Sequence, residues 1–259
     1  MTSETTATRS FKERLVAGEF VCGIFACIPT FQTVEILSHT DIDFLALEAE
    51  HAATSIPILH QQIVAAGGRK PVLVRVGSEH VDTLKPLLDL GVDAIMVPNV
   101  HTAEQARHIV SLTRFGPEGR RGVGGSVRAA RWGLDKTYYR RGPSPIAITV
   151  QIESREALEN LGAICDVEGV DAVFFGPNDL AAQIGFPGEP NAPKVREALA
   201  DGMRLARKRG VVCGCLAPAA DIAHWRGCGG TFFLSGSDIG ALIQGTNAIA
   251  ATVARGTAS

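Results

Sequence analysis

Two carboxylates and a histidine follow a short apolar run in the stretch FLALEAEHA. Residues 44–47 have the length and composition of a buried strand, so Glu48, Glu50 and His51 come where that strand leaves the core. Carboxylates can hold a cation, and histidine can move protons near neutral pH. This strand end is therefore a candidate catalytic site, with simple surfacing of the strand as the alternative.

Polar side chains also end other apolar runs of the sequence. Arg75 is the penultimate residue of PVLVRV, Glu153 follows IAITVQI, and Asp179 comes three residues after AVFFG. Carboxylate oxygens suit a hard divalent cation such as Mg or Mn, and a two-carboxylate site leaves positions open for substrate and water. An arginine supplies planar donors for a carboxylate or a developing enolate. With His51 as a proton-transfer group, the set suits metal-assisted enolisation of a 2-oxo acid.

The elements that must position these residues alternate along the chain. Helical stretches separate eight strand-like runs rich in Val, Ile and Phe, as in a covered parallel sheet. This alternation over about 250 residues predicts a (β/α)8 barrel, in which active sites lie at the carboxyl ends of the strands. A doubly wound open sheet is the alternative, but no run is followed by GxGxxG. The predicted strands are 21–26, 44–47, 71–76, 94–98, 146–152, 172–176, 211–217 and 231–235.

Composition limits the remaining possibilities. The chain has 259 residues, 46 % of them hydrophobic and 20 % charged, so it can bury a large core. A net charge of −2 and the lack of an apolar run of about 20 residues predict neither a nucleic-acid nor a membrane partner. Six scattered cysteines without a CxxC motif fit a reducing cytoplasm. We expect a flexible tail over residues 1–9 and a single barrel domain over 10–259.

Residues 115–145 depart from the regular alternation. The segment is long for a connection inside a compact domain, where about 2 to 6 residues is usual. It contains six arginines together with Trp132, Tyr138 and Tyr139. It is either a solvated basic loop or a segment that contacts another subunit or reaches into a site.

Several motifs, in order, resemble the HpcH/HpaI aldolase family. They include FLALEAEHA, LLDLGVDAIMVPNVHTAEQA, GPEGRRGVGGSVRAARW, VQIES, GPNDLA and FFLSGSD, and the match runs from about residue 10 to residue 255. The family contains metal-dependent class II pyruvate aldolases, which are aldehyde-lyases that cleave 4-hydroxy-2-oxo acids to pyruvate and an aldehyde. Their substrates include 4-hydroxy-2-oxoheptanedioate and 2-keto-3-deoxy sugar acids. The resemblance implies a divalent metal (Mg, Mn or Co) and no organic cofactor.

The resemblance also implies roles for individual residues. Glu153 and Asp179 match the metal ligands, Arg75 the enolate stabiliser and His51 the base. Asp89 matches the acid that pairs with that histidine. The pyruvate pocket corresponds to Gln151 and to the backbone of Gly176, Pro177, Asn178 and Asp179. Phe25 and Glu48 stand where the family often has Trp and Asp, and with Leu216 they are expected to flank the acceptor aldehyde.

Two other functions are compatible with the sequence. One is a phosphate-binding barrel isomerase or synthase that uses Ser235, Gly236 and Ser237 at a helix start. Another is a catalytically silent barrel that acts as an assembly module through residues 115–145. A Schiff-base mechanism is disfavoured because no lysine follows a strand at its carboxyl end. The apolar C-terminal stretch ALIQGTNAIAATVA and the resemblance predict an additional C-terminal helix used in a homo-oligomer, specifically a hexamer.

Overall fold

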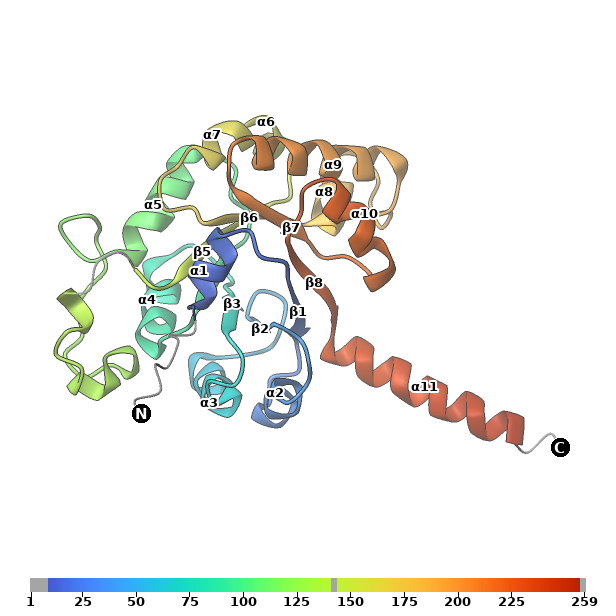
Figure 1. The fold of residues 1–259 in the computed structure, drawn as a ribbon, viewed down its shortest axis with the longest axis horizontal. Helices are drawn as coiled ribbons and strands as arrows, with labels where there is room; N and C mark the ends of the chain where they lie inside the picture. The colour runs from blue at the N-terminus through green and yellow to red at the C-terminus, as the bar shows by residue number, and fades with distance from the viewer. Residues whose placement is uncertain (1–8, 141–143, 257–259) are drawn as a thin grey trace, which may run out of the picture.

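Eight parallel strands form the centre of the computed structural model, which describes residues 9–140 and 144–256 (Figure 1). Hydrogen bonds link them in the order β7-β6-β5-β4-β3-β2-β1-β8. The bridge between Leu216 and Leu234 joins β7 to β8 and closes the barrel. The predicted (β/α)8 barrel and all eight predicted strands are confirmed. They are β1 (Val21–Ala26), β2 (Phe44–Glu48), β3 (Val72–Arg75), β4 (Ala94–Val97), β5 (Ala147–Ile152), β6 (Ala172–Phe175), β7 (Val212–Cys215) and β8 (Phe232–Ser237).

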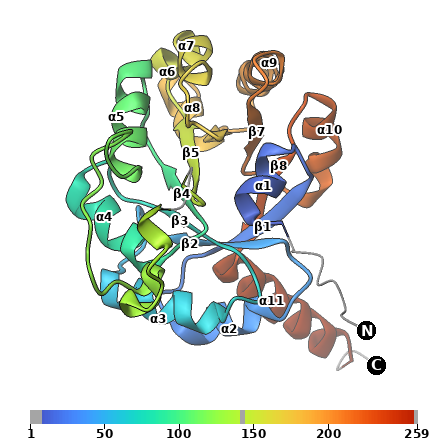
Figure 2. The same cartoon turned by 60° about the vertical axis from the view of Figure 1, so that its left-hand side comes forward.

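Helices surround the strands, as Figure 2 shows. They are α1 (Phe11–Val16), α2 (Phe31–Ser38), α3 (Ile56–Ala66), α4 (Val81–Leu90), α5 (Ala103–Thr113), α6 (Arg155–Glu159), α7 (Leu161–Cys165), α8 (Pro177–Gln183), α9 (Pro193–Lys208), α10 (Ile222–Gly227) and α11 (Asp238–Gly256). Short 3-10 turns are η1 (Arg128–Gly133), η2 (Tyr138–Arg140) and η3 (Ala219–Asp221). Most of the strands are apolar on both faces because helices cover the outside and side chains fill the inside.

The interior of the barrel is packed with aromatic side chains. Phe44 and Phe232 lie with ring centroids 5.4 Å apart, and Phe11 from α1 packs 5.2 Å from Phe44. Gly23 makes room for this cluster, because a Cβ there would lie 2.6 Å from the Phe44 ring. The amino end of the barrel is thus filled by apolar contacts, which leaves the carboxyl end as the open mouth.

The long segment before β5 packs on its own barrel. Arg121 is 5 % exposed, and its guanidinium donates to Asp89 (3.0 Å) and to the Tyr138 hydroxyl (3.2 Å). Arg128 donates to the backbone carbonyl of Leu90 at the end of α4 (2.6 Å). A purely solvated basic loop is therefore the wrong interpretation, because Arg121 satisfies a carboxylate and a hydroxyl inside the fold.

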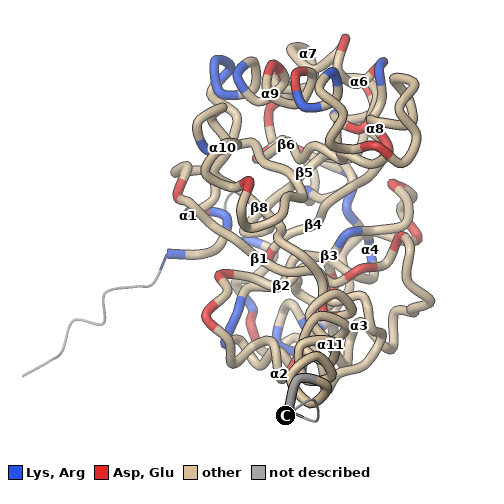
Figure 3. The backbone as a smooth tube through the Cα atoms, turned by 90° about the vertical axis from the view of Figure 1, so that its right-hand side faces the viewer, with Lys and Arg blue, Asp and Glu red and all other residues tan. Residues whose placement is uncertain are grey.

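Helix α11 extends away from the barrel instead of folding back onto it (Figure 1). Its side chains at Leu242, Ile249 and Val253 are 63 %, 68 % and 61 % exposed, and no charged residue lies between Ile239 and Ala254 (Figure 3). The buried carboxylate of Asp238 anchors the start of α11, since it accepts the backbone N–H groups of Cys27 (2.9 Å) and Ile28 (3.0 Å). The extra C-terminal helix is confirmed.

All six cysteines are free thiols, four buried and two half-buried. Burial raises the pKa of Cys27 to about 11 and those of Cys165 and Cys213 to about 12. Within the described ranges, no helix is both long and apolar enough to cross a bilayer. The predicted tail falls largely outside the described residues, and α1 begins at Phe11, where Ser10 and Glu13 form a capping box.

Candidate active site at the barrel mouth

Glu48 lies in the floor of the mouth, buried to 3 % exposure at the end of β2. The strand register places it directly beside Arg75, the last residue of β3. One carboxylate oxygen accepts the backbone N–H groups of Glu50 (2.7 Å) and His51 (2.9 Å), and the other accepts from Arg75 Nε (2.7 Å). Both oxygens of Glu48 are thus engaged inside the protein, and the expectation that Glu48 flanks the acceptor aldehyde stays a prediction.

The Arg75 guanidinium is held from three sides. Besides Glu48, its Nε lies 3.3 Å from the Glu50 carboxylate. The Phe25 ring, from the end of β1, stacks on the guanidinium with 4.6 Å between the central carbon and the ring centroid. Phe25 thus contacts the arginine directly, in a cation–π geometry. The arginine side chain is fixed before any substrate arrives.

His51 lies at the outer edge of the mouth. Its side chain is 65 % exposed, and its Nε2 is 3.6 Å from the Glu50 carboxylate. The backbone of this turn is fixed through Glu48, as described above, while the imidazole itself reaches toward solvent. The imidazole is therefore accessible from the mouth, and its role in proton transfer stays a prediction.

Asp89 is not placed beside His51 in this chain. It is one residue from the end of α4, which runs antiparallel to the strands, and therefore lies at the amino end of the barrel. There it pairs with the buried Arg121. The expected pairing of Asp89 with His51 is not made within the chain, because the two residues occupy opposite ends of the barrel.

Glu153 is a buried carboxylate, 4 % exposed, at the end of β5. Its oxygens accept the backbone N–H of Asn99 (2.7 Å) and the side-chain amide of Gln151 (2.8 Å). Burial, together with the negative charges of Glu50 and Asp179, raises the pKa of Glu153 to about 7, although the hydrogen bond from the Asn99 N–H acts in the opposite direction. A cation placed at this carboxylate would relieve both effects.

Gly176 leaves the space that Glu153 occupies. A Cβ at Gly176 would lie 2.9 Å from the Glu153 Cβ and would overlap its carboxylate oxygen. Pro177 begins α8 directly after this glycine, and Asp179 stands in the first turn of that helix. The short β6–α8 junction therefore brings the second carboxylate to the mouth beside the first.

The donor set fits a hard divalent ion. Two oxygen donors, Glu153 and Asp179, come from adjacent strand ends. In the part of the chain that the structure describes, no group of three or more His, Cys, Asp or Glu side chains forms a ready metal cluster. The pair therefore suits a metal that keeps open positions for substrate and water, and does not suit a closed structural site.

Two buried polar atoms inside the barrel lack a hydrogen-bond partner within the described part of the protein. Neither Gln151 Oε1 nor Thr149 Oγ1 has a hydrogen-bond partner, although both residues are almost fully buried. Buried polar atoms are normally satisfied, so a ligand or water is expected beside them. Phe25 and Leu216 pack on the same interior cluster, so an apolar wall adjoins this polar floor.

Comparison with known proteins decides the family. The model of the family described as HpcH/HpaI aldolase/citrate lyase matches residues 22–245. The chain belongs to this family.

Several relatives of known name support this. The 2-keto-3-deoxy-L-rhamnonate aldolase of Escherichia coli (strain K12) is 42 % identical over 218 residues, which cover 83 % of this chain and 81 % of the relative. An HpcH/HpaI aldolase/citrate lyase family protein from Burkholderia cenocepacia J2315 superposes with a TM-score of 0.91 at 31 % identity, covering 95 % and 99 % of the two chains. The citrate synthase SbnG has a TM-score of 0.83 at 28 % identity, covering 96 % and 99 %.

The sequence did not predict the contacts of three residues near the mouth of this family member. Glu50 belongs to the candidate strand end but had no role of its own, and in the structure it contacts Arg75 and His51. Its position two residues after Glu48 was the available signal, since alternate residues of extended chain share a face. Asn99 and Gln105 shape the turn that contacts Glu153, and nothing in their types indicated this.

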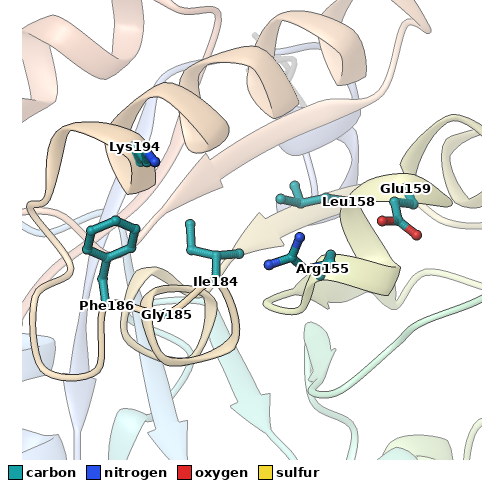
Figure 4. A pocket seen from close by; sticks show the side chains of 7 residues that line it. All are labelled: Arg155, Leu158, Glu159, Ile184, Gly185, Phe186 and Lys194. Atoms are coloured by element: carbon teal, nitrogen blue, oxygen red, sulfur yellow. The ribbon is translucent and has the colours of Figure 1, made fainter.

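A separate cavity lies between α6, the connection from α8 to α9 and the start of α9 (Figure 4). Its volume is about 510 Å³. None of the predicted site residues lines it. The lining residues are Arg155, Leu158, Glu159, Ile184, Gly185, Phe186 and Lys194.

Proposed function

We propose that the chain is a metal-dependent aldolase that cleaves a 4-hydroxy-2-oxo acid, of the 2-keto-3-deoxy sugar-acid kind, into pyruvate and an aldehyde. The observation that carries the proposal is the buried Glu153 carboxylate, which shares one mouth with Asp179 and with the fixed guanidinium of Arg75. Membership of the aldolase family and a relative named as a 2-keto-3-deoxy-L-rhamnonate aldolase support the reaction class.

Glu153 and Asp179 would hold the divalent ion, with Mg, Mn or Co as candidates. When bound, the ion supplies Lewis-acid polarisation of the substrate's 2-oxo group and compensates its developing negative charge. Gln151 keeps the Glu153 side chain in its rotamer through the 2.8 Å hydrogen bond. The remaining chemistry falls to the side chains around the mouth.

Arg75 stabilises the enolate of pyruvate as the C3–C4 bond breaks. Its planar N–H donors are already oriented by Glu48 and Phe25, so little reorganisation accompanies the appearance of charge. The backbone around Gly176 to Asp179 binds the pyruvate carboxylate. Gln151 lines the same end of the pocket, where its free carbonyl oxygen can accept a hydrogen bond from water. Phe25 and Leu216 form the apolar wall next to the acceptor carbons.

His51 takes the proton of the substrate's 4-hydroxyl group. Its exposed position suits a group that must also return the proton to solvent, and Glu50 stabilises the imidazolium form that results. Cleavage then leaves the aldehyde at the outer side of the mouth and the enolate beside Arg75. A proton from the His51 imidazolium, relayed through water, then goes to C3, which completes pyruvate and returns His51 to its neutral form.

The deciding experiment is a cleavage screen of 4-hydroxy-2-oxo acids, each with Mg, Mn or Co and with excess chelator. We expect pyruvate release that chelator abolishes and metal restores. Undiminished turnover in chelator would overturn the metal proposal. Citrate formation is assayed in parallel, because the structural neighbours include a citrate synthase.

The phosphate-binding alternative is less well supported. Ser237 Oγ already accepts the Gly240 N–H at the start of α11, and the buried Asp238 carboxylate occupies the same corner. A second anion would be repelled there. Inorganic phosphate should therefore neither bind measurably nor inhibit by competing with pyruvate.

We also propose that the chain forms a homo-oligomer, a hexamer, through the apolar side chains of α11. An exposed helix with this many large apolar groups is a liability for a monomer. A reducing cytoplasm suits the six free thiols. Nucleic-acid and membrane partners are not part of the proposal.

A further inference from the structure

The turn between β4 and α5 has an unusual backbone at the point where it contacts the site. Asn99 has φ of +57°, a left-handed conformation that residues other than glycine seldom adopt, although asparagine does so more often than most. In this conformation its N–H donates to Glu153 Oε1 at 2.7 Å. Such strained residues persist where the surroundings hold them in place.

Gln105 is the group that holds this turn. Its Oε1 accepts the His101 N–H (2.8 Å), and its Nε2 donates to the backbone carbonyl of Asn99 (3.0 Å). One amide group therefore ties both ends of the Asn99–His101 turn together. The same Nε2 also donates to Glu79, in the connection after β3, and this contact anchors the amide from the other side.

The other contacts of the turn do not fix Asn99. His101 bonds through its ring to Ser154 Oγ (2.8 Å), and its carbonyl accepts from Asn160 (2.9 Å). These bonds fix the end of the turn nearest α5. The Asn99 carbonyl has Gln105 as its side-chain donor, so loss of that amide frees the peptide on which the left-handed geometry depends.

We propose that Gln105 is a positioning residue for the metal site: it holds Asn99 in the left-handed conformation, so that the Asn99 N–H fixes the rotamer of Glu153. The inference rests on the proposed role of Glu153 as a metal ligand. Groups that orient metal ligands commonly change metal affinity about 10- to 100-fold when removed.

A simpler role for Gln105 would be to cap α5. Thr102 Oγ1 accepts the Gln105 N–H (3.1 Å), and a glutamine three residues after a capping threonine often completes a capping box. A cap stabilises the helix but has no direct effect on metal binding. Thr102→Ala removes the cap without touching the Asn99 contacts, and so separates the two roles.

The test measures the dissociation constant of Mn²⁺ in the full-length protein by electron paramagnetic resonance, together with the thermal midpoint of the metal-free form. We expect Gln105→Ala to weaken Mn²⁺ binding about 10-fold or more, and saturating metal to restore most of kcat. Gln105→Glu, which keeps the acceptor but loses the donor to Asn99, should weaken binding as well and serves if the alanine variant folds poorly. Thr102→Ala should lower the thermal midpoint and leave Mn²⁺ affinity unchanged.

Rescue provides the specific check. Adding Asn99→Gly to Gln105→Ala should recover part of the lost affinity, because glycine adopts positive φ without steric strain. The proposal is overturned if Gln105→Ala binds Mn²⁺ as the unmodified protein does while Glu153→Gln loses it. If Glu153→Gln also binds normally, the proposed metal ligand is wrong, which is a different failure.

Discussion

At the scale of single residues, the mouth is a set of charges that mostly compensate one another. Arg75 lies between Glu48 and Glu50, whereas Glu153 and Asp179 have no cationic side chain in direct contact among the described residues. The uncompensated negative charge therefore lies on Glu153 and Asp179, the two residues proposed to bind the metal. Glu48 and Glu50 both contact the Arg75 guanidinium and hold it in place. Substitution of a residue that holds Arg75 should therefore affect catalysis differently from substitution of His51.

His51→Ala tests proton transfer. Aldol cleavage requires removal of the 4-hydroxyl proton, so the variant should lose roughly 10² to 10⁴ in rate. Decarboxylation of oxaloacetate needs only enolate stabilisation and should suffer much less. Both activities are measured at saturating metal, and an equal loss of the two would assign His51 a structural role.

Glu48→Ala should behave differently. Because Glu48 holds both Arg75 and the turn that carries His51, its removal should lower cleavage and decarboxylation together, by about 10- to 100-fold. Glu35→Ala, at an exposed position on α2, is the matched control and should leave both rates unchanged. If the Glu48 variant changed only which aldehydes are accepted, Glu48 would be assigned to the acceptor pocket instead.

The types of residue at the mouth were predictable, but their contacts were not. Glu153, Asp179 and Arg75 stand at strand ends in the sequence, and strand ends meet at one rim of a barrel. Which carboxylate is buried against the arginine depends on side-chain direction and on the register of β2 and β3. Asparagine tolerates the left-handed conformation of Asn99, but the hydrogen bond from Gln105, six residues later, is a contact that local propensity does not reveal.

At the scale of elements, the junctions between strand and helix determine the site. The β6–α8 junction is the tightest example, because Gly176 leaves no space between its backbone and Glu153. The eight strands followed from the apolar runs of the sequence. The segment over 115–140 did not, since its packing on α4 relies on a buried arginine that composition classes as solvated.

Gly176→Ala should therefore act on the metal site without unfolding the barrel. The added methyl group must displace the Glu153 carboxylate, and we expect metal affinity to fall by about 10-fold or more. Gly227→Ala, where a Cβ would meet open space at the end of α10, is the control. Mn²⁺ titration and thermal melting of both variants check the prediction. Unchanged affinity in Gly176→Ala would mean that Glu153 relaxes without consequence.

At the scale of the whole molecule, two features reach beyond the individual barrel. Asp89 lies at the amino end, away from His51 of its own chain, and α11 leaves the barrel surface entirely. The position of Asp89 could have been inferred, because LLDLG precedes a strand and so lies at the opposite end from the mouth. The direction of α11 could not be inferred, since the sequence pattern of an apolar helix is the same whether the helix packs back on the barrel or extends away from it.

The side chains of α11 give a direct test of assembly. Leu242→Asp with Ile249→Asp should shift the molecular mass in solution to a smaller species, because burying each such side chain contributes about 1.5 to 3 kcal/mol. Gln244→Glu, on the same helix, adds one charge without removing an apolar group and should leave the mass unchanged. Light scattering after size exclusion decides, and a monomeric unmodified chain at micromolar concentration would refute the proposed oligomer.

Alkylation of the buried cysteines can be used to measure how often the protein unfolds, locally or globally. Four thiols are buried, and burial keeps the half-buried Cys27 protonated at neutral pH, so alkylating reagents find few reactive thiolates in the native state. The four buried thiols are then modified in proportion to the population of molecules that expose them, when opening and closing are fast relative to alkylation. Counting modified thiols by mass spectrometry reports the population of opened molecules, and does so in crude extracts and at dilutions where calorimetry fails.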